Sequence, residues 1–141
     1  MALLRANIIF AVANLLHTAD HQRQGTAGLS WEIFVGGSAI TIAAIASLVL
    51  AWRRDWRAPV FGTVLGFSAA AGIASSHLAP HWSALSDSYP QIHADAISWV
   101  VVLVEIGAAV LLAVVGAVEL RRASSPEPRA AVRAAAGRST T

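Results

Sequence analysis

The chain has 141 residues, of which 56% are hydrophobic and only 13% are charged. Soluble domains carry roughly 25% charged residues, so this composition and a mean hydropathy of +0.60 exclude an ordinary soluble fold and predict a membrane protein. Cysteine is absent, which excludes disulfides, thiol chemistry, iron–sulfur clusters and cysteine-based zinc sites. The formal net charge is +2, and the arginines flank apolar runs, so we expect membrane lipid rather than nucleic acid as a partner.

Four apolar segments follow one another along the chain, each about the length needed to cross a hydrocarbon core of ~30 Å. The first also fits a signal peptide with a cleavage-like triplet at residues 11–13, so its retention is left open. The third begins near Pro59 and is stopped by Pro80, which disfavours helix at the residue before it. The predicted spans are about residues 3–21, 31–52, 58–78 and 95–120.

The segments between the spans are short and polar. Residues 23–30 form a polar loop and residues 53–57 an arginine-rich turn, and loop 81–94 is expected to carry an interfacial turn with Trp82, Leu85 and Tyr89. Past residue 122 the composition shifts to Ser, Pro, Ala and Arg, which predicts a disordered cytoplasmic tail over 123–141. Residues 1–122 therefore form one all-α domain, an up-down bundle of four transmembrane helices.

The positions of the arginines predict the orientation of this bundle. With four spans, Arg23 falls on one side of the membrane and every other arginine on the opposite side. The positive-inside rule then puts both termini and the 53–57 turn in the cytoplasm of a multi-pass cell-membrane protein. Gly62 and Gly66 have small-xxx-small spacing, so the third span is expected in the bundle interior or at a homo-oligomer interface.

Every histidine falls near the non-cytoplasmic end of the bundle. His17 and His21 are four residues apart, as are His77 and His81, so each pair can offer two imidazoles to one metal ion. Carboxylates nearby would complete or orient such a site. Without thiols, this ligand set suits Zn, Fe or Cu. The predicted metal ligands are His17, His21, His77, His81, Asp20 and Asp95.

Glu105 lies about ten residues, or ~15 Å, inside the fourth span. A carboxylate at that depth needs a hydrogen-bond partner or a cation, and it marks a candidate functional site. Asn14 and His17 lie at a matching depth in the first span. Glu105 and Glu32 are the predicted catalytic proton-transfer groups. The residues predicted to contact a cofactor or substrate are Asn14, Arg23 and Ser98.

Several functions fit this constellation. The first is a membrane-embedded metal site, either in a metal-dependent enzyme acting on a lipid-soluble small molecule or in a metal-handling protein. A second is haem held by one histidine from each of the first and third spans. A third is a non-enzymatic subunit whose polar cluster is structural, and a fourth is transport by a homodimer. The sequence leaves open whether the protein is an enzyme and whether His93 joins the site.

Overall fold

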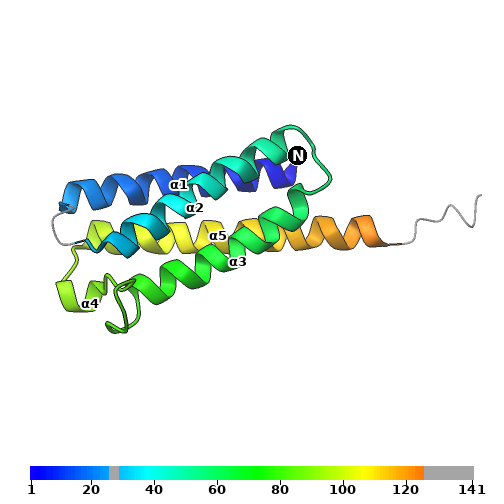
Figure 1. Ribbon diagram of the computed structural model, residues 1–141. Coiled ribbons are helices and arrows are strands. Elements are labelled where there is room, and N and C mark those ends of the chain that lie inside the picture. The colour runs from blue at the N-terminus through cyan, green and yellow to red at the C-terminus, as the bar shows by residue number, and fades with distance from the viewer. Residues whose placement is uncertain (26–28, 126–141) are drawn as a thin grey trace, which may run out of the picture.

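A computed structural model describes residues 1–25 and 29–125 of the chain (Figure 1). The described chain is all-α, as predicted, and contains four long helices that are each long and apolar enough to cross a membrane. This indicates a multi-pass membrane protein. The elements are α1 (Ala2–Gln24), α2 (Trp31–Trp52), α3 (Ala58–His77), the short α4 (Tyr89–Ile92) and α5 (Ala96–Ser124).

The helix ends are set by residues that satisfy free backbone groups. The Ser30 hydroxyl accepts a hydrogen bond from the Ile33 amide at 3.1 Å at the start of α2. The Asp95 carboxylate does the same for the Ser98 amide at 3.0 Å at the start of α5. Proline lies in the first turn of α3, where its missing N–H costs nothing. These local signals explain why the long helices begin within one residue of the predicted positions.

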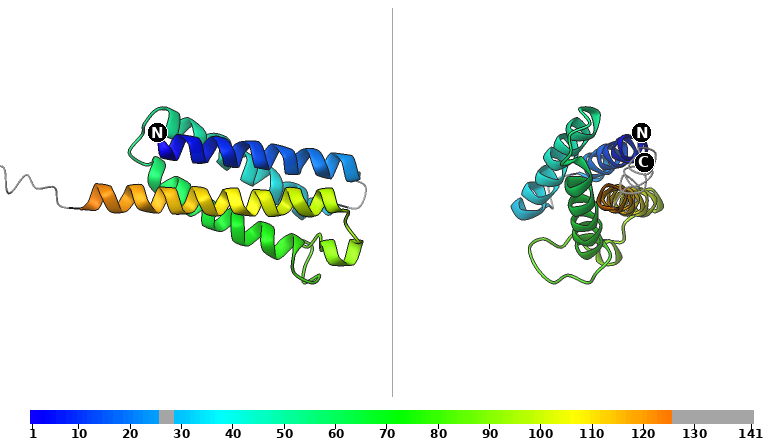
Figure 2. Two further views of the ribbon diagram at one scale, coloured as in Figure 1. Left: turned by 180° about the vertical axis from the view of Figure 1, so that it is seen from behind. Right: turned by 90° about the vertical axis from the view of Figure 1, so that its right-hand side faces the viewer.

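The long helices alternate in direction and form an up-down bundle (Figures 1 and 2). The C-terminal ends of α1 and α3, the N-terminal ends of α2 and α5, and the short α4 all lie at one end, called here the histidine end. The N-terminus, the α2–α3 turn and the C-terminal end of α5 lie at the other. Helix α5 runs beside both α1 and α3, whereas α2 packs on the outside of the bundle. Sequence-distant polar residues therefore meet at the histidine end.

The bundle buries several polar side chains within its apolar core and exposes many large apolar side chains. Glu105 is 0% exposed and Asn7 is 1% exposed, whereas Leu15 and Val100 are 61% and 60% exposed. Soluble proteins expose few contiguous large apolar side chains, because water drives them inward. The exposed apolar faces of the four long helices therefore suit contact with hydrocarbon, and the polar residues avoid it.

Helices α3 and α5 approach closely because two glycines lie at their contact. A Cβ on Gly66 would lie 2.5 Å from both the Ala109 carbonyl oxygen and the Ala113 backbone nitrogen. A Cβ on Gly116 would lie 2.8 Å from the carbonyl oxygen of Pro59. Neither backbone can yield easily, so only glycine permits this spacing. Gly66, which suggested an interior or oligomer-interface helix, lies inside the monomer.

Gly66→Ala is expected to destabilise the fold by about 1–3 kcal/mol, because the added methyl group forces the two backbones apart. The matched control is Gly72→Ala in the same helix, where a Cβ meets no atom within 4 Å. It should be neutral or stabilising by up to ~1 kcal/mol. Thermal unfolding in detergent, followed by circular dichroism, measures both changes. Equal stability of the two variants would contradict this account of the α3–α5 contact.

The structure differs from the prediction at the ends of two helices and in loop 81–94. Helix α1 continues to Gln24 rather than residue 21, and α5 continues to Ser124. Loop 81–94 contains α4, and Tyr89, expected at the membrane interface, is 0% exposed because its ring packs against His77 and Trp99. The predicted tail from residue 126 onward lies outside the described residues.

Candidate metal centre

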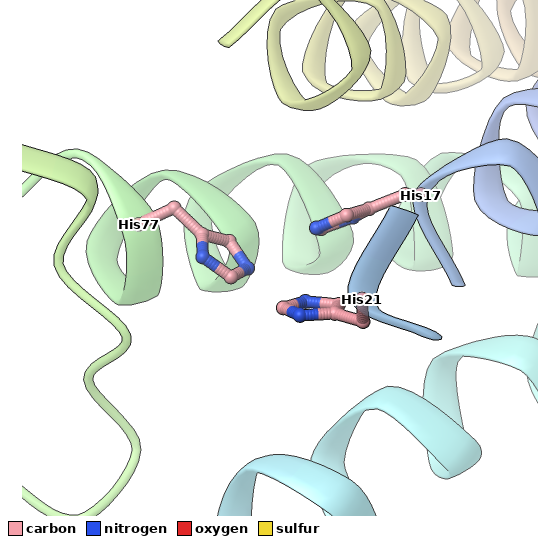
Figure 3. A group of neighbouring side chains, drawn as sticks. All are labelled: His17, His21 and His77. Carbon is pink, nitrogen blue, oxygen red and sulfur yellow. The ribbon is translucent and has the colours of Figure 1, made fainter. Parts of the chain in front are cut away.

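Three histidines from two helices meet at the histidine end (Figure 3). His17 and His21 are one turn apart on α1, and His77 is the last residue of α3. Their ring centroids lie 4.7 Å apart for His17 and His21, 4.8 Å for His17 and His77, and 5.3 Å for His21 and His77. One ligand atom from each residue lies within 4.8 Å of the others, so the group could hold a metal ion. We call it the three-histidine cluster.

A chain of hydrogen bonds orients His17 from inside the bundle. The fully buried Glu105 accepts a hydrogen bond from His17 Nδ1, and its other oxygen accepts one from Asn14 Nδ2 at 2.8 Å. The Thr41 hydroxyl donates to the Asn14 side-chain oxygen at 2.8 Å. Because a carboxylate accepts hydrogen bonds, this contact favours the tautomer of His17 with its proton on Nδ1, and Nε2 then faces the Tyr89 hydroxyl. This series of hydrogen bonds connects α2, α1 and α5 at one depth.

Asp87 lies beside the other two histidines and accepts a hydrogen bond from one of them. His77 Nδ1 donates to the Asp87 backbone carbonyl at 3.2 Å. The Asp87 carboxylate lies 3.7 Å from His77 Nδ1 and 3.8 Å from His21 Nδ1. The Asp87 amide donates to the Ser76 carbonyl at 2.9 Å, which anchors this loop residue to α3. Nδ1 of His17 and Nδ1 of His77 are therefore hydrogen-bonded to acceptors, and Nδ1 of His21 lies near the Asp87 carboxylate without a hydrogen bond to it.

Tyr89 closes the cluster on the loop side. Its ring lies 4.7 Å from that of His77, and its hydroxyl lies 3.4 Å from His17 Nε2. Burial raises the pKa of Tyr89 to about 12, so the hydroxyl keeps its proton at neutral pH. It can therefore donate to His17 Nε2 or to another acceptor near that nitrogen.

An ion-pair network covers the outer edge of the site and ties α1 to α5. The Arg23 guanidinium donates to Asp20 at 2.8 Å, to Asp95 at 2.8 and 3.0 Å, and to the Ser98 hydroxyl at 3.0 Å. Gln24 also donates to Asp20 at 2.7 Å. A planar guanidinium suits such simultaneous contacts, because its donors lie in a fixed fork. This network connects the ends of the two helices that carry His17 and Glu105.

The hydrogen bond from Arg23 holds the pKa of the Asp95 carboxyl at about 2, below its ordinary value of 3.8. Because the folded pKa is lowered, the contribution of the pair is complete above the ordinary value and is lost as the pH falls toward 2. Arg23→Gln is expected to return the Asp95 pKa toward 3.8, as measured by a carbon-13 carboxyl NMR titration. Arg5→Gln, at the opposite end, should leave it unchanged. An unaltered Asp95 titration in Arg23→Gln would contradict the network.

The structure brings some of the predicted site residues together and leaves others outside the site. Asn14 and His17 contact Glu105, and Arg23 and Ser98 lie in the network beside the three-histidine cluster. The predicted ligands Asp20 and Asp95 contact Arg23 rather than the cluster. Glu32 is exposed in the first turn of α2, and His81 and His93 are exposed outside the cluster.

The sequence did not assign Thr41, Asp87 or Tyr89 to the site. Thr41 could have been found by depth, because α1 and α2 are antiparallel neighbours and Thr41 lies opposite Asn14. Asp87 and Tyr89 belong to a connecting segment without helical periodicity, so spacing gave no signal for them. No protein-family model, curated protein or solved structure matches the chain. The functional argument therefore rests on the geometry of the site.

Proposed function

We propose that the protein is a membrane-embedded, metal-dependent enzyme that uses a divalent ion, zinc in the first instance, held by His17, His21 and His77. The observation that carries the proposal is the convergence of three imidazoles, two of which have Nδ1 hydrogen-bonded to an acceptor, while Nδ1 of His21 lies 3.8 Å from the Asp87 carboxylate. Histidines that bind metals almost always donate their second ring nitrogen to a carboxylate or carbonyl, which leaves the other nitrogen as the ligand. Histidines that merely fill space need no such arrangement.

The charges around the cluster favour a divalent ion. Three neutral imidazoles contribute no charge, while Glu105 is fully buried and Asp87 is mostly buried beside the rings. Two carboxylates and one divalent ion sum to zero, which matters in a low-dielectric membrane interior where net charge is costly. A monovalent ion would leave a net negative charge. Glu105 and Asp87 would thereby orient the histidine ligands and balance the charge of the metal ion.

The number of ligands favours catalysis over a purely structural role. Structural zinc sites are closed by four protein ligands, whereas catalytic sites keep one position for water or substrate. The cluster supplies three histidines, and the Tyr89 hydroxyl lies 3.4 Å from His17 Nε2, where it can donate to a group in the open position. A bound divalent ion supplies Lewis-acid chemistry: it polarises a substrate oxygen or activates water. Glu105 has both oxygens engaged, which supports a positioning role.

Two alternatives receive less support. Haem would need space for a macrocycle between His17 and His77, yet these rings are 4.8 Å apart and contact His21 and Tyr89. Transport would need a polar path through the bundle. The polar stripe of α1 is interrupted by Phe10, which is 0% exposed on the face shared with Asn7 and Asn14. With the arginine-rich end in the cytoplasm, the cluster would act at the opposite membrane face.

The test is the metal content of the wild-type protein, purified in detergent without chelators and without a metal-affinity column. Elemental mass spectrometry is expected to find about one divalent ion per chain, or one equivalent bound after Zn²⁺ is added. The visible spectrum should show no Soret band. A protein that binds no Zn²⁺ on titration would overturn the proposal, and a Soret band with stoichiometric iron would assign the site to haem.

A further inference from the structure

The end of the bundle opposite the histidine end carries an excess of positive charge. The N-terminus, the α2–α3 turn and the C-terminal end of α5 meet there (Figures 1 and 2). This arginine-rich end holds six exposed arginines within the described residues: Arg5, Arg53, Arg54, Arg57, Arg121 and Arg122. The described part of the chain places only two acidic side chains there, Asp55 and Glu119, which leaves a net side-chain charge of +4. Such a surface attracts anionic partners.

Three of these arginines belong to the 53–57 turn, and little in the described chain neutralises them. Arg57 Nε lies 3.6 Å from Asp55 Oδ1, a contact that is too long for a hydrogen bond and, with Arg57 largely exposed, contributes little attraction. Within residues 1–25 and 29–125, no carboxylate oxygen lies within 4.0 Å of the Arg53 or Arg54 guanidinium. A guanidinium carries five donors and no acceptor, and its fork matches the oxygens of a phosphate group. The turn therefore presents donors that a phosphate can use.

The 53–57 turn is held in one conformation by its own hydrogen bonds. The Asp55 carboxylate accepts a hydrogen bond from the Arg57 amide at 2.9 Å, and the Asp55 amide donates to the Leu50 carbonyl at 3.0 Å. Arg54 adopts a left-handed backbone conformation, with φ of 54°. Glycine or asparagine would take this conformation with less strain, so the turn itself gives no reason for a long charged side chain there. Because the backbone is already ordered, binding a ligand costs little conformational entropy.

Two exposed tryptophans in and beside this turn favour a lipid over a soluble anion as the partner. Trp52 and Trp56 are 73% and 78% exposed, and the Arg57 guanidinium lies 5.5 Å from the centre of the Trp56 ring. Indole rings gather at the level of lipid head groups, because the ring is apolar and its N–H is polar. Trp52 ends α2 and α3 begins at Ala58, and both helices are apolar enough to cross a membrane. The arginines of the turn therefore belong at the depth of the lipid phosphates.

We propose that the 53–57 turn binds the phosphate of an anionic phospholipid, with Arg53, Arg54 and Arg57 as the donors. A zwitterionic phospholipid carries the same phosphate together with an ammonium group, which the arginines repel. A lipid whose head group has a net negative charge lacks that cation and is preferred. Each basic residue near a membrane surface strengthens such binding roughly fivefold. The proposal does not depend on the metal centre, which lies at the opposite end of the bundle.

The experiment titrates the full chain in detergent with dioleoyl phosphatidylglycerol, which is anionic, or with dioleoyl phosphatidylcholine, which is zwitterionic. Native mass spectrometry gives the dissociation constant of each lipid. The wild type is expected to bind phosphatidylglycerol roughly tenfold more tightly. The turn variant Arg53→Gln/Arg54→Asn/Arg57→Gln should reduce this preference to less than about twofold. Asparagine tolerates the left-handed conformation at position 54, so the variant should keep the fold, which circular dichroism checks.

The matched control is Arg5→Gln/Arg121→Gln/Arg122→Gln, which removes the same number of charges from the same end and leaves the 53–57 turn intact. It should keep a preference for phosphatidylglycerol of at least about fivefold. Equal affinity of the wild type for the two lipids would overturn the proposal without recourse to any variant. An equal loss of preference in both triple variants would show attraction by net charge alone and overturn the proposed site, as would a preference unchanged in the turn variant. A single-stranded oligonucleotide that binds the wild type but not the turn variant, with no lipid preference, would assign the surface to nucleic acid instead.

Discussion

Replacing His17 with alanine is expected to lower the affinity of the protein for Zn²⁺ by more than roughly a hundredfold, and His77→Ala should do the same. Loss of a group that only orients a metal ligand costs roughly 10–100-fold, so loss of the ligand itself should cost more. Each substitution leaves two histidines of the cluster and a vacant ligand position. Competition with a fluorescent zinc chelator measures the affinity of each purified variant.

His81→Ala is the control for this experiment. His81 lies four residues after His77, but it is exposed and outside the cluster. Its substitution should leave the zinc affinity within about twofold of wild type, since it changes neither ligand number nor ligand orientation. An affinity loss in His81→Ala as large as that in His77→Ala would show that the ligand set is wrong. Unchanged affinity in all three variants would show that the cluster joins the helices without binding the metal.

The fold was largely predictable because a membrane imposes simple requirements. Long apolar runs must become helices that satisfy their own backbone hydrogen bonds, and the four runs of this chain all do. Depth within a span also predicts contacts between antiparallel helices. Glu105 needed a partner, Asn14 and His17 lay at its depth, and both are hydrogen-bonded to it. The spacing of His17 and His21 likewise put two imidazoles on one face of α1.

The rest of the site depended on the segment between α3 and α5. The four-residue spacing of His77 and His81 implies a shared face only if the helix continues through both. Helix α3 ends at His77 because Pro80 follows, so His81 turns away from the cluster. In the same segment, Asp87 and Tyr89 fold back over the histidines. A loop without periodicity gives no sequence signal for such a return, and only the three-dimensional arrangement shows it.

Glu105→Gln is expected to lower the zinc affinity roughly 10–100-fold while changing the free energy of unfolding of the metal-free protein by less than about 1 kcal/mol. A glutamine amide has one acceptor and one donor, whereas Glu105 accepts from both Asn14 and His17. If the amide nitrogen faces His17, Nδ1 must become the acceptor and the ring proton moves to Nε2. That tautomer can donate to Tyr89 but cannot bind a metal through Nε2. Zinc titration and chemical unfolding of the metal-free variant measure the two effects.

The separation of these two effects distinguishes a metal centre from a structural polar cluster. A cluster that only joins α1 to α5 would show no dependence of metal binding on Glu105, whatever the exchange does to stability, because no ligand orientation depends on that carboxylate. A metal centre tolerates the exchange without metal, since His17 can change its tautomer, and loses affinity because the metal requires the original one. Glu119→Gln, a matched exchange in the same helix and outside the site, should change neither quantity. Loss of stability with unchanged zinc affinity would therefore reject the metal centre even if the three histidines remained in contact.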